Sequence, residues 1–91
     1  MKKILLVEDD IAMSNGIYFA LQSLDYDVMQ CFTLKEAGKI DLEEISLILL
    51  DVNLPDGNGL EYLKEVREKR NTQIILLTAN DLETDIVTGL E

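Results

Sequence analysis

The chain has 91 residues, of which 47% are hydrophobic, and its formal net charge is −10 at pH 7. This length predicts a single domain, residues 1–91, and the negative charge argues against direct binding to nucleic acid or anionic lipid. Because the chain has no histidine and one cysteine, Cys31, the sequence excludes imidazole-ligated metals, a thiolate zinc site and an internal disulfide. No apolar stretch reaches the length of a membrane span, so we expect a soluble cytoplasmic protein.

The first half of the chain predicts two strands and two helices. Residues 4–7 form an apolar run that fits a buried strand. A helical spacing of apolar residues follows, made of Met13, Ile17, Ala20, Leu21 and Leu24. Residues 26–32 alternate as in a second strand, and Thr33 with Glu36 forms a capping box that opens a helix to about Leu42.

The second half repeats the pattern. Residues 47–50 are apolar throughout, as in a buried parallel strand, and residues 54–59 have the composition of a turn. A third helix is marked by Leu60, Leu63 and Val66. A fourth strand at 74–77 precedes a last helix capped by Asn80 or Asp81. This alternation predicts an α/β fold, a doubly wound parallel sheet in which strands 4–7 and 47–50 are central neighbours.

Polar side chains follow three of these strands at the point where each apolar run stops. Glu8, Asp9 and Asp10 follow the first strand, Asp51 the third and Thr78 the fourth. Parallel strands end at one edge of the sheet, where open α/β sheets bind their ligands, so we expect these groups to meet. Two unit charges about 4 Å apart repel by roughly 4 kcal/mol at an effective dielectric constant of about 20. A proton or a cation must relieve this repulsion, and a set of oxygen ligands suits Mg²⁺.

Each feature also has a simpler interpretation when it is considered alone. The acids after the first strand could merely cap the following helix and complement its dipole. Asp51 and Asp56 could be ordinary turn residues, and Thr78 could simply end a strand. The register of all these features at one edge of the sheet favours a shared site.

Three segments resemble the receiver domain of two-component response regulators. They are residues 4–10 (Ile-Leu-Leu-Val-Glu-Asp-Asp), 49–57 (Leu-Leu-Asp-Val-Asn-Leu-Pro-Asp-Gly) and 77–79 (Leu-Thr-Ala). The resemblance covers the whole chain in order and is strongest to receivers that precede a winged-helix DNA-binding domain in transcription regulators. It implies a flavodoxin-like (CheY-like) fold and a phospho-accepting signalling module that is not a turnover enzyme.

The resemblance implies a role for each residue of the cluster. Asp51 would accept a phosphoryl group from a sensor histidine kinase or from a small acyl phosphate. Glu8 and Asp9, together with Asp51 and the backbone carbonyl of Asn53, would hold Mg²⁺. Thr78 would bond the phosphoryl group through its hydroxyl and shift when that group arrives.

Other positions depart from the family pattern or lie at its margin. Asn53 and Asn80 match two variable positions that tune the phosphoryl lifetime, and Asp10 is expected to be a helix cap. The family continues with a fifth strand and a fifth helix, which supply a lysine that pairs with the phosphoryl group and an aromatic switch residue; residues 79–91 contain neither residue type. We therefore expect an incomplete domain with weakened phosphoryl stabilisation, which self-associates through the exposed edge of strand 74–77 or by exchanging terminal elements.

Two other functions stay open at this point. One is a non-switching module that acts only by assembling with itself or with a partner. The other is a Mg²⁺-dependent phosphohydrolase with an aspartyl-phosphate intermediate. Such enzymes usually carry a second acid two positions after the nucleophile, and here that position is Asn53, which cannot donate a proton.

Overall fold

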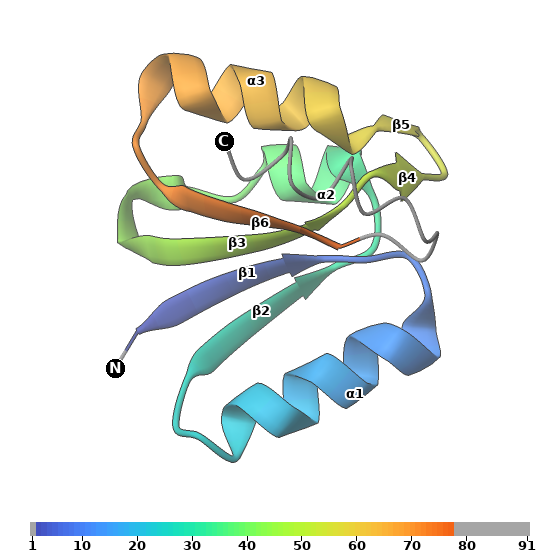
Figure 1. Cartoon of the computed structure of the whole chain (residues 1–91), viewed down its shortest axis with the longest axis vertical. Helices are drawn as coiled ribbons and strands as arrows, with labels where there is room; N and C mark the ends of the chain where they lie inside the picture. The colour runs from blue at the N-terminus through green and yellow to red at the C-terminus, as the bar shows by residue number, and fades with distance from the viewer. Residues whose placement is uncertain (1, 78–91) are drawn as a thin grey trace.

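A computed structural model describes residues 2–77, which form a parallel sheet with helices on both sides (Figure 1). The main sheet has the strand order β2-β1-β3-β6, and every neighbouring pair is parallel. The bounds of these strands are Lys3–Val7 for β1, Asp27–Cys31 for β2, Ile45–Asp51 for β3 and Gln73–Leu77 for β6. The predicted doubly wound α/β arrangement, with β1 and β3 as adjacent central strands, is confirmed.

A short antiparallel pair follows β3 directly. It consists of β4 (Asn53–Leu54) and β5 (Gly57–Asn58), in which Asn53 pairs with Asn58 and Leu54 with Gly57. The two strands and their turn will be called the β4–β5 hairpin. The sequence predicted only a turn at 54–59, because two-residue strands carry no hydrophobic periodicity of their own.

The helices divide between the two faces of the sheet. α1 (Ile11–Gln22) lies on one face, and α2 (Leu34–Gly38) and α3 (Gly59–Lys69) lie on the other (Figure 1). Within residues 2–77, no helix is both long and apolar enough to traverse a lipid bilayer. The predicted fourth helix, with its caps at residues 80 and 81, lies outside the described residues.

The second helix is shorter than its sequence predicted. α2 ends at Gly38 instead of continuing to about Leu42. A 3-10 helix, η1 (Leu42–Glu44), begins after Asp41, whose Oδ1 accepts the N–H of Glu43 at 3.0 Å. Glycine weakens a helix interior and aspartate favours a new N-cap, so these two residues divide the expected helix.

The central strands are buried on both faces. In β1, Leu5 and Val7 belong to the core beneath α2 and α3, whereas Ile4 and Leu6 pack toward α1. All four side chains are at most 3% exposed. Burying a leucine or isoleucine side chain contributes about 1.5–3 kcal/mol, so the two-sided burial of β1 anchors the sheet and the acids that follow it.

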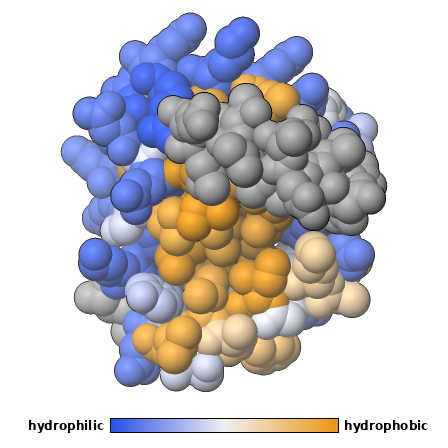
Figure 2. All heavy atoms as spheres, viewed as in Figure 1, coloured by the Kyte–Doolittle hydropathy of each residue, from blue (hydrophilic) through white to orange (hydrophobic). Residues whose placement is uncertain are grey.

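The face by which α1 packs matches the predicted face only in part. Ser14 is the residue of α1 that is fully buried, and Ile17, Tyr18 and Leu21 are partly buried around it. Met13 is 41% exposed, and Leu24, just beyond the helix, is 66% exposed. On the side of the molecule seen in Figure 2, a hydrophobic area runs from the middle of the view down to α1. Ile17 and Leu21 of the predicted stripe are confirmed, whereas the expected burial of Met13, Ala20 and Leu24 was wrong because α1 is apolar on most of its circumference.

Candidate functional site

The register of β1 and β3 brings the two groups of acids together. Val7 pairs with Leu50, so Glu8 and Asp51 come next at the same level of the two strands. The backbone N–H of Glu8 donates to the carbonyl oxygen of Cys31 at 3.0 Å, which extends the ladder between β1 and β2 by one residue. Glu8 is therefore held as firmly as a strand residue, although it follows the strand.

Three carboxylates form the cluster. Glu8, Asp9 and Asp51 each offer a carboxylate oxygen, and these atoms all lie within 4.8 Å of one another. Glu8 is 4% exposed and Asp51 is 7% exposed, whereas Asp9 is exposed. The cluster is thus open to solvent on one side and closed by the protein on the other.

Backbone N–H groups hold the two buried carboxylates in place. The N–H of Asp10 donates to Oε2 of Glu8 at 3.1 Å, and the N–H of Asn53 makes a longer contact of 3.4 Å with Oδ1 of Asp51. Asp10 turns its own side chain away and accepts the N–H of Met13 at 3.1 Å, as the N-cap of α1. The structure agrees with the prediction that Asp10 is a helix cap rather than a member of the cluster.

Burial makes the charged form of both inner carboxylates costly. Burial raises the pKa of Glu8 from its ordinary value of 4.5 to about 7, and the charge of Asp51 adds to this rise. Burial likewise raises the pKa of Asp51, against the opposing effect of the Asn53 N–H. Both residues hold their negative charge more readily if a cation lies between them.

The donor atoms fit a hard divalent cation. The cluster supplies carboxylate oxygens alone, the ligand type that Mg²⁺ prefers. Ligands on opposite sides of an Mg²⁺ ion lie about 4 Å apart, since each bond is about 2.1 Å long. Oxygens within 4.8 Å of one another can therefore reach one ion with small side-chain movements.

The other two predicted site residues are less well defined by the structure. Asn53 is exposed at the start of β4, two residues beyond Asp51, and the role of its carbonyl group stays a prediction. Thr78 lies outside the described residues, as does Asn80. The structure thus brings together three of the five predicted site residues and places a fourth beside them.

Gly59 supports the site and was missed by the sequence interpretation. Its N–H donates to the carbonyl oxygen of Val52 at 2.7 Å, and a Cβ atom at this position would overlap the carbonyl oxygen of Asp51. Only glycine allows the start of α3 to approach the backbone of Asp51 so closely. Gly59 is the second glycine of the Asp-Gly-Asn-Gly turn, and this glycine was the sequence feature that could have indicated a close backbone approach.

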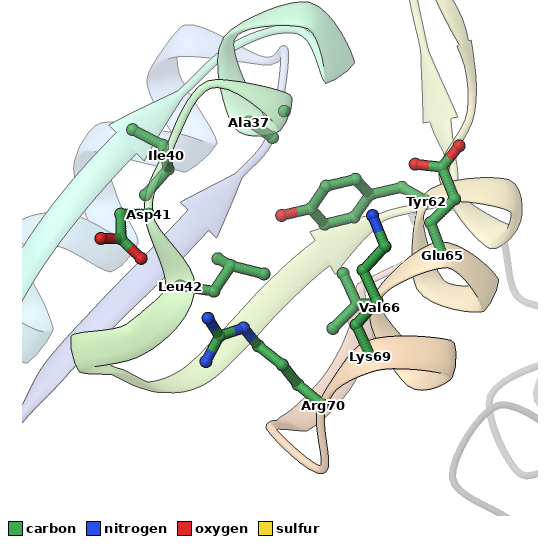
Figure 3. A pocket seen from close by; sticks show the side chains of 10 residues that line it. Ala37, Ile40, Asp41, Leu42, Tyr62, Glu65, Val66, Lys69 and Arg70 are labelled. Atoms are coloured by element: carbon green, nitrogen blue, oxygen red, sulfur yellow. The ribbon is translucent and has the colours of Figure 1, made fainter.

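A separate hollow lies between α2 and α3 (Figure 3). It encloses about 260 Å³, and its lining includes Tyr62, Lys69 and Arg70 but none of the three clustered carboxylates. The Tyr62 hydroxyl is buried and has no hydrogen-bond partner among residues 2–77. Burial raises the pKa of Tyr62 to about 12, so this hydroxyl stays protonated at neutral pH. The chemistry that the sequence predicts is at the carboxylate cluster and not in this hollow.

Comparison with known proteins agrees with this geometry. The sequence profile of the response regulator receiver domain matches residues 4–91. The regulatory protein VanR of Enterococcus faecium is 39% identical over 89 residues, which are 97% of this chain and 38% of VanR. The aerobic respiration control protein ArcA of Escherichia coli strain K12 is 37% identical over 89 residues, which are 97% of this chain and 37% of ArcA. The chain thus spans about two fifths of the length of these curated relatives.

Two solved structures share the fold closely. The BeF3-activated N-terminal receiver domain of RstA from Klebsiella pneumoniae has a TM-score of 0.87 and 31% identity, and the match covers 98% of this chain and 77% of that one. The response regulator TrrA of Thermotoga maritima, in complex with Mg(2+)-BeF, has a TM-score of 0.85 and 31% identity, with 99% and 81% covered.

The raised pKa of Glu8 predicts that the metal-free chain loses stability as the pH rises. The folded state binds this proton more tightly (pKa about 7) than the unfolded chain does (4.5), so the stabilising contribution is complete below pH 4.5 and is lost as the pH rises through 7. The difference corresponds to on the order of 3 kcal/mol. Urea unfolding at about pH 5 and about pH 8 measures most of this loss of stability. Glu8→Gln should remove most of the difference in the free energy of unfolding between the two pH values.

Mg²⁺ should stabilise the wild-type chain more at about pH 8 than at about pH 5, because the ion and the proton compete for one site. Glu43→Gln, which removes an exposed charge in η1, is the control and should keep the wild-type pH dependence. The same pH dependence in wild type and Glu8→Gln would contradict this account.

The close approach of Gly59 to Asp51 predicts a specific effect of a single methyl group. Gly59→Ala should lower the free energy of unfolding by about 1–3 kcal/mol and weaken Mg²⁺ binding, because the added Cβ displaces the backbone of Asp51. Gly16→Ala in α1 is the matched control, since a Cβ there meets no atom within 4 Å. It should stabilise the helix by about 0.5–1 kcal/mol and leave Mg²⁺ binding unchanged. Thermal unfolding with and without Mg²⁺ measures both effects, and equal Mg²⁺ responses in the two variants would count against the role of Gly59.

Proposed function

Because this chain belongs to the family of response regulator receiver domains, we propose that Asp51 is its phosphoryl acceptor and that Glu8, Asp9 and Asp51 hold Mg²⁺. The observation that supports this assignment is the cluster itself, in which an oxygen of Asp51 lies within 4.8 Å of oxygens from both other acids. The backbone carbonyl of Asn53 is proposed as a further ligand. We also propose that residues 1–91 belong to a single receiver domain.

The reaction needs little from the protein beyond position and charge. A carboxylate oxygen of Asp51 attacks the phosphorus atom of the donor, a new P–O bond forms, and the bond to the leaving group breaks with its electron pair. Bound Mg²⁺ supplies positive charge that offsets the repulsion between the carboxylate and the phosphoryl oxygens. The product is an acyl phosphate on Asp51, which water can hydrolyse, so the modification is reversible.

Burial prepares Asp51 for this step. Its side chain is only 7% exposed and is fixed at the end of β3, so it loses little freedom when the donor arrives. Burial raises the pKa of Asp51, so a cation beside this carboxylate would favour its ionised, nucleophilic form. Glu8 and Asp9 are proposed to hold the cation that keeps Asp51 ionised.

The partners and the setting are proposals that rest on the relatives. The donor is proposed to be a sensor histidine kinase, and the output is proposed to be regulation of transcription through a DNA-binding domain outside this chain. This setting is cytoplasmic, and Asp51 is modified rather than acting as the catalyst of a turnover enzyme. Self-association is also proposed, supported by β6 as an outer strand of the described sheet and by its Ile75, which is 41% exposed. Thr78 is proposed to bond the phosphoryl group.

Replacing Asp51 tests the assignment directly. The wild-type chain, treated with a small acyl phosphate and Mg²⁺, should gain the mass of one phosphoryl group, and chelation of Mg²⁺ should abolish the gain. Asp51→Asn should gain nothing, because an amide is not a nucleophile toward phosphorus. Asp10→Asn is the matched control: it makes the same chemical change next to the cluster and keeps an N-cap for α1, so its uptake should equal that of the wild type.

The other outcomes distinguish the remaining functions. Incorporation that survives Asp51→Asn would remove Asp51 from the acceptor role. Turnover of phosphomonoesters by the wild-type chain would favour the phosphohydrolase. A chain that incorporates no phosphoryl group, and whose oligomeric state is the same with and without a phosphoryl mimic and Mg²⁺, would favour a module that acts only by assembly.

A further inference from the structure

Asp56 connects the loop after the acceptor strand to a distant helix. It lies in the turn of the hairpin, between β4 and β5. Its Oδ1 accepts the backbone N–H of Leu34 at 2.9 Å, and its Oδ2 accepts the backbone N–H of Lys35 at 2.9 Å. Both carboxylate oxygens are thus used on one helix end, which lies more than twenty residues earlier in the chain.

These bonds do more than cap the start of α2. Thr33 already caps α2, since its Oγ1 accepts the N–H of Glu36 at 3.1 Å, and Oε1 of Glu36 accepts the N–H of Phe32 at 2.7 Å. The Thr33–Glu36 capping box could form without any contribution from the hairpin. Asp56 satisfies the two remaining N–H groups at the start of this five-residue helix. Its bonds therefore complete the cap of α2 with acceptors from a distant segment, and they tie the hairpin to the helix.

The backbone of the hairpin also lies directly against α2. Gly57 has a φ angle of +156°, and a Cβ atom there would come within 2.9 Å of Cδ1 of Leu34. A side chain at this position would require the Leu34 side chain or the hairpin to shift. Gly57 and Asp56 thus indicate independently that the hairpin is docked on α2.

The hairpin transmits this docking to the acceptor site. Asn53 pairs with Asn58 across the hairpin, and the N–H of Asn53 lies 3.4 Å from Oδ1 of Asp51. On the other side of the hairpin, the N–H of Gly59 bonds the carbonyl of Val52. A movement of the turn at Asp56 would therefore displace Asn53, the proposed backbone ligand, and with it the contact to Asp51.

We propose that Asp56 is a positioning residue for the Asp51 site, which sets the place of Asn53 by docking the hairpin on α2. This inference rests on the proposed function of Asp51. Asp56 is itself exposed and is not part of the group of acids that can hold a cation, so it acts through the hairpin and not by binding the ion. The two N–H groups hold the pKa of Asp56 below its usual range, so it is a carboxylate at neutral pH.

A graded pair of variants and a matched control test the proposal. Asp56→Ala removes both acceptor atoms and Asp56→Asn leaves one, so the rate of phosphoryl uptake at saturating Mg²⁺ should fall about fivefold for Ala and less for Asn. The control is Asp41→Ala, which removes another aspartate that accepts a backbone N–H at a helix start, but one located before β3, at the opposite edge of the sheet. Asp41→Ala should lose a similar amount of thermal stability and keep the wild-type rate.

A second measurement separates positioning from general stability. Addition of Mg²⁺ should shift the NMR amide signals of Leu34 and Lys35 in the wild-type chain and in Asp41→Ala, because the site and α2 are connected through the hairpin. In Asp56→Asn the shifts should be smaller, and in Asp56→Ala they should vanish while the signals near Glu8 still respond.

The proposal is overturned if Asp56→Asn and Asp56→Ala match Asp41→Ala in uptake rate and in the Mg²⁺ response of Leu34 and Lys35. If Asp56→Ala does not fold, the same comparison with Asp56→Asn decides. A wild-type chain that takes up no phosphoryl group would end the proposed function instead. The Mg²⁺ response of the α2 amides would then decide on Asp56 alone.

Discussion

The parallel pairing of β1 with β3 determines where the acids of the cluster lie relative to one another. Both strands are apolar on both faces, so hydrophobic alternation alone does not fix how far one slides along the other. The acids at their ends supply the missing restriction. With Val7 opposite Leu50, Glu8 and Asp51 stand at the edge of the sheet. A slip that drew either acid further inward would surround its carboxylate with apolar side chains such as Leu6, which is fully buried. The observed register limits this cost and also builds the site.

The same placement makes the site costly for the fold in the absence of a cation. Glu8 and Asp51 are buried enough for desolvation to raise the pKa of each. The negative charge of Asp51 raises the pKa of Glu8 further. A chain selected for stability alone would have apolar or neutral residues at these positions. The cost is explained if the acids serve a bound divalent ion and a negatively charged substrate, because the carboxylate charges are then needed to bind the ion.

The central strands and the cluster could be predicted because their signals are local. Short apolar runs that stop at acids identify β1 and β3, and parallel topology then brings the acids together. The packing face of α1 was found only in part, because Ile11, Met13 and Phe19 make the helix nearly as apolar on its exposed side as on its buried side. Asp56 and Gly59 were missed for another reason. Their partners, the start of α2 and the backbone of Asp51, become neighbours only after the chain has folded.

If the acids at the carboxyl edge of the sheet share one divalent ion, paramagnetic broadening by Mn²⁺ should be confined to their surroundings. At substoichiometric Mn²⁺, the NMR signals of amides in residues 8–10 and 51–53 should disappear first. Amides at the opposite edge, such as those of Lys3, Asp27 and Ile45, should stay sharp, and an excess of Mg²⁺ should restore the lost signals. Broadening centred on the exposed acids Glu43 and Glu44, or spread evenly over this acidic chain, would contradict the account.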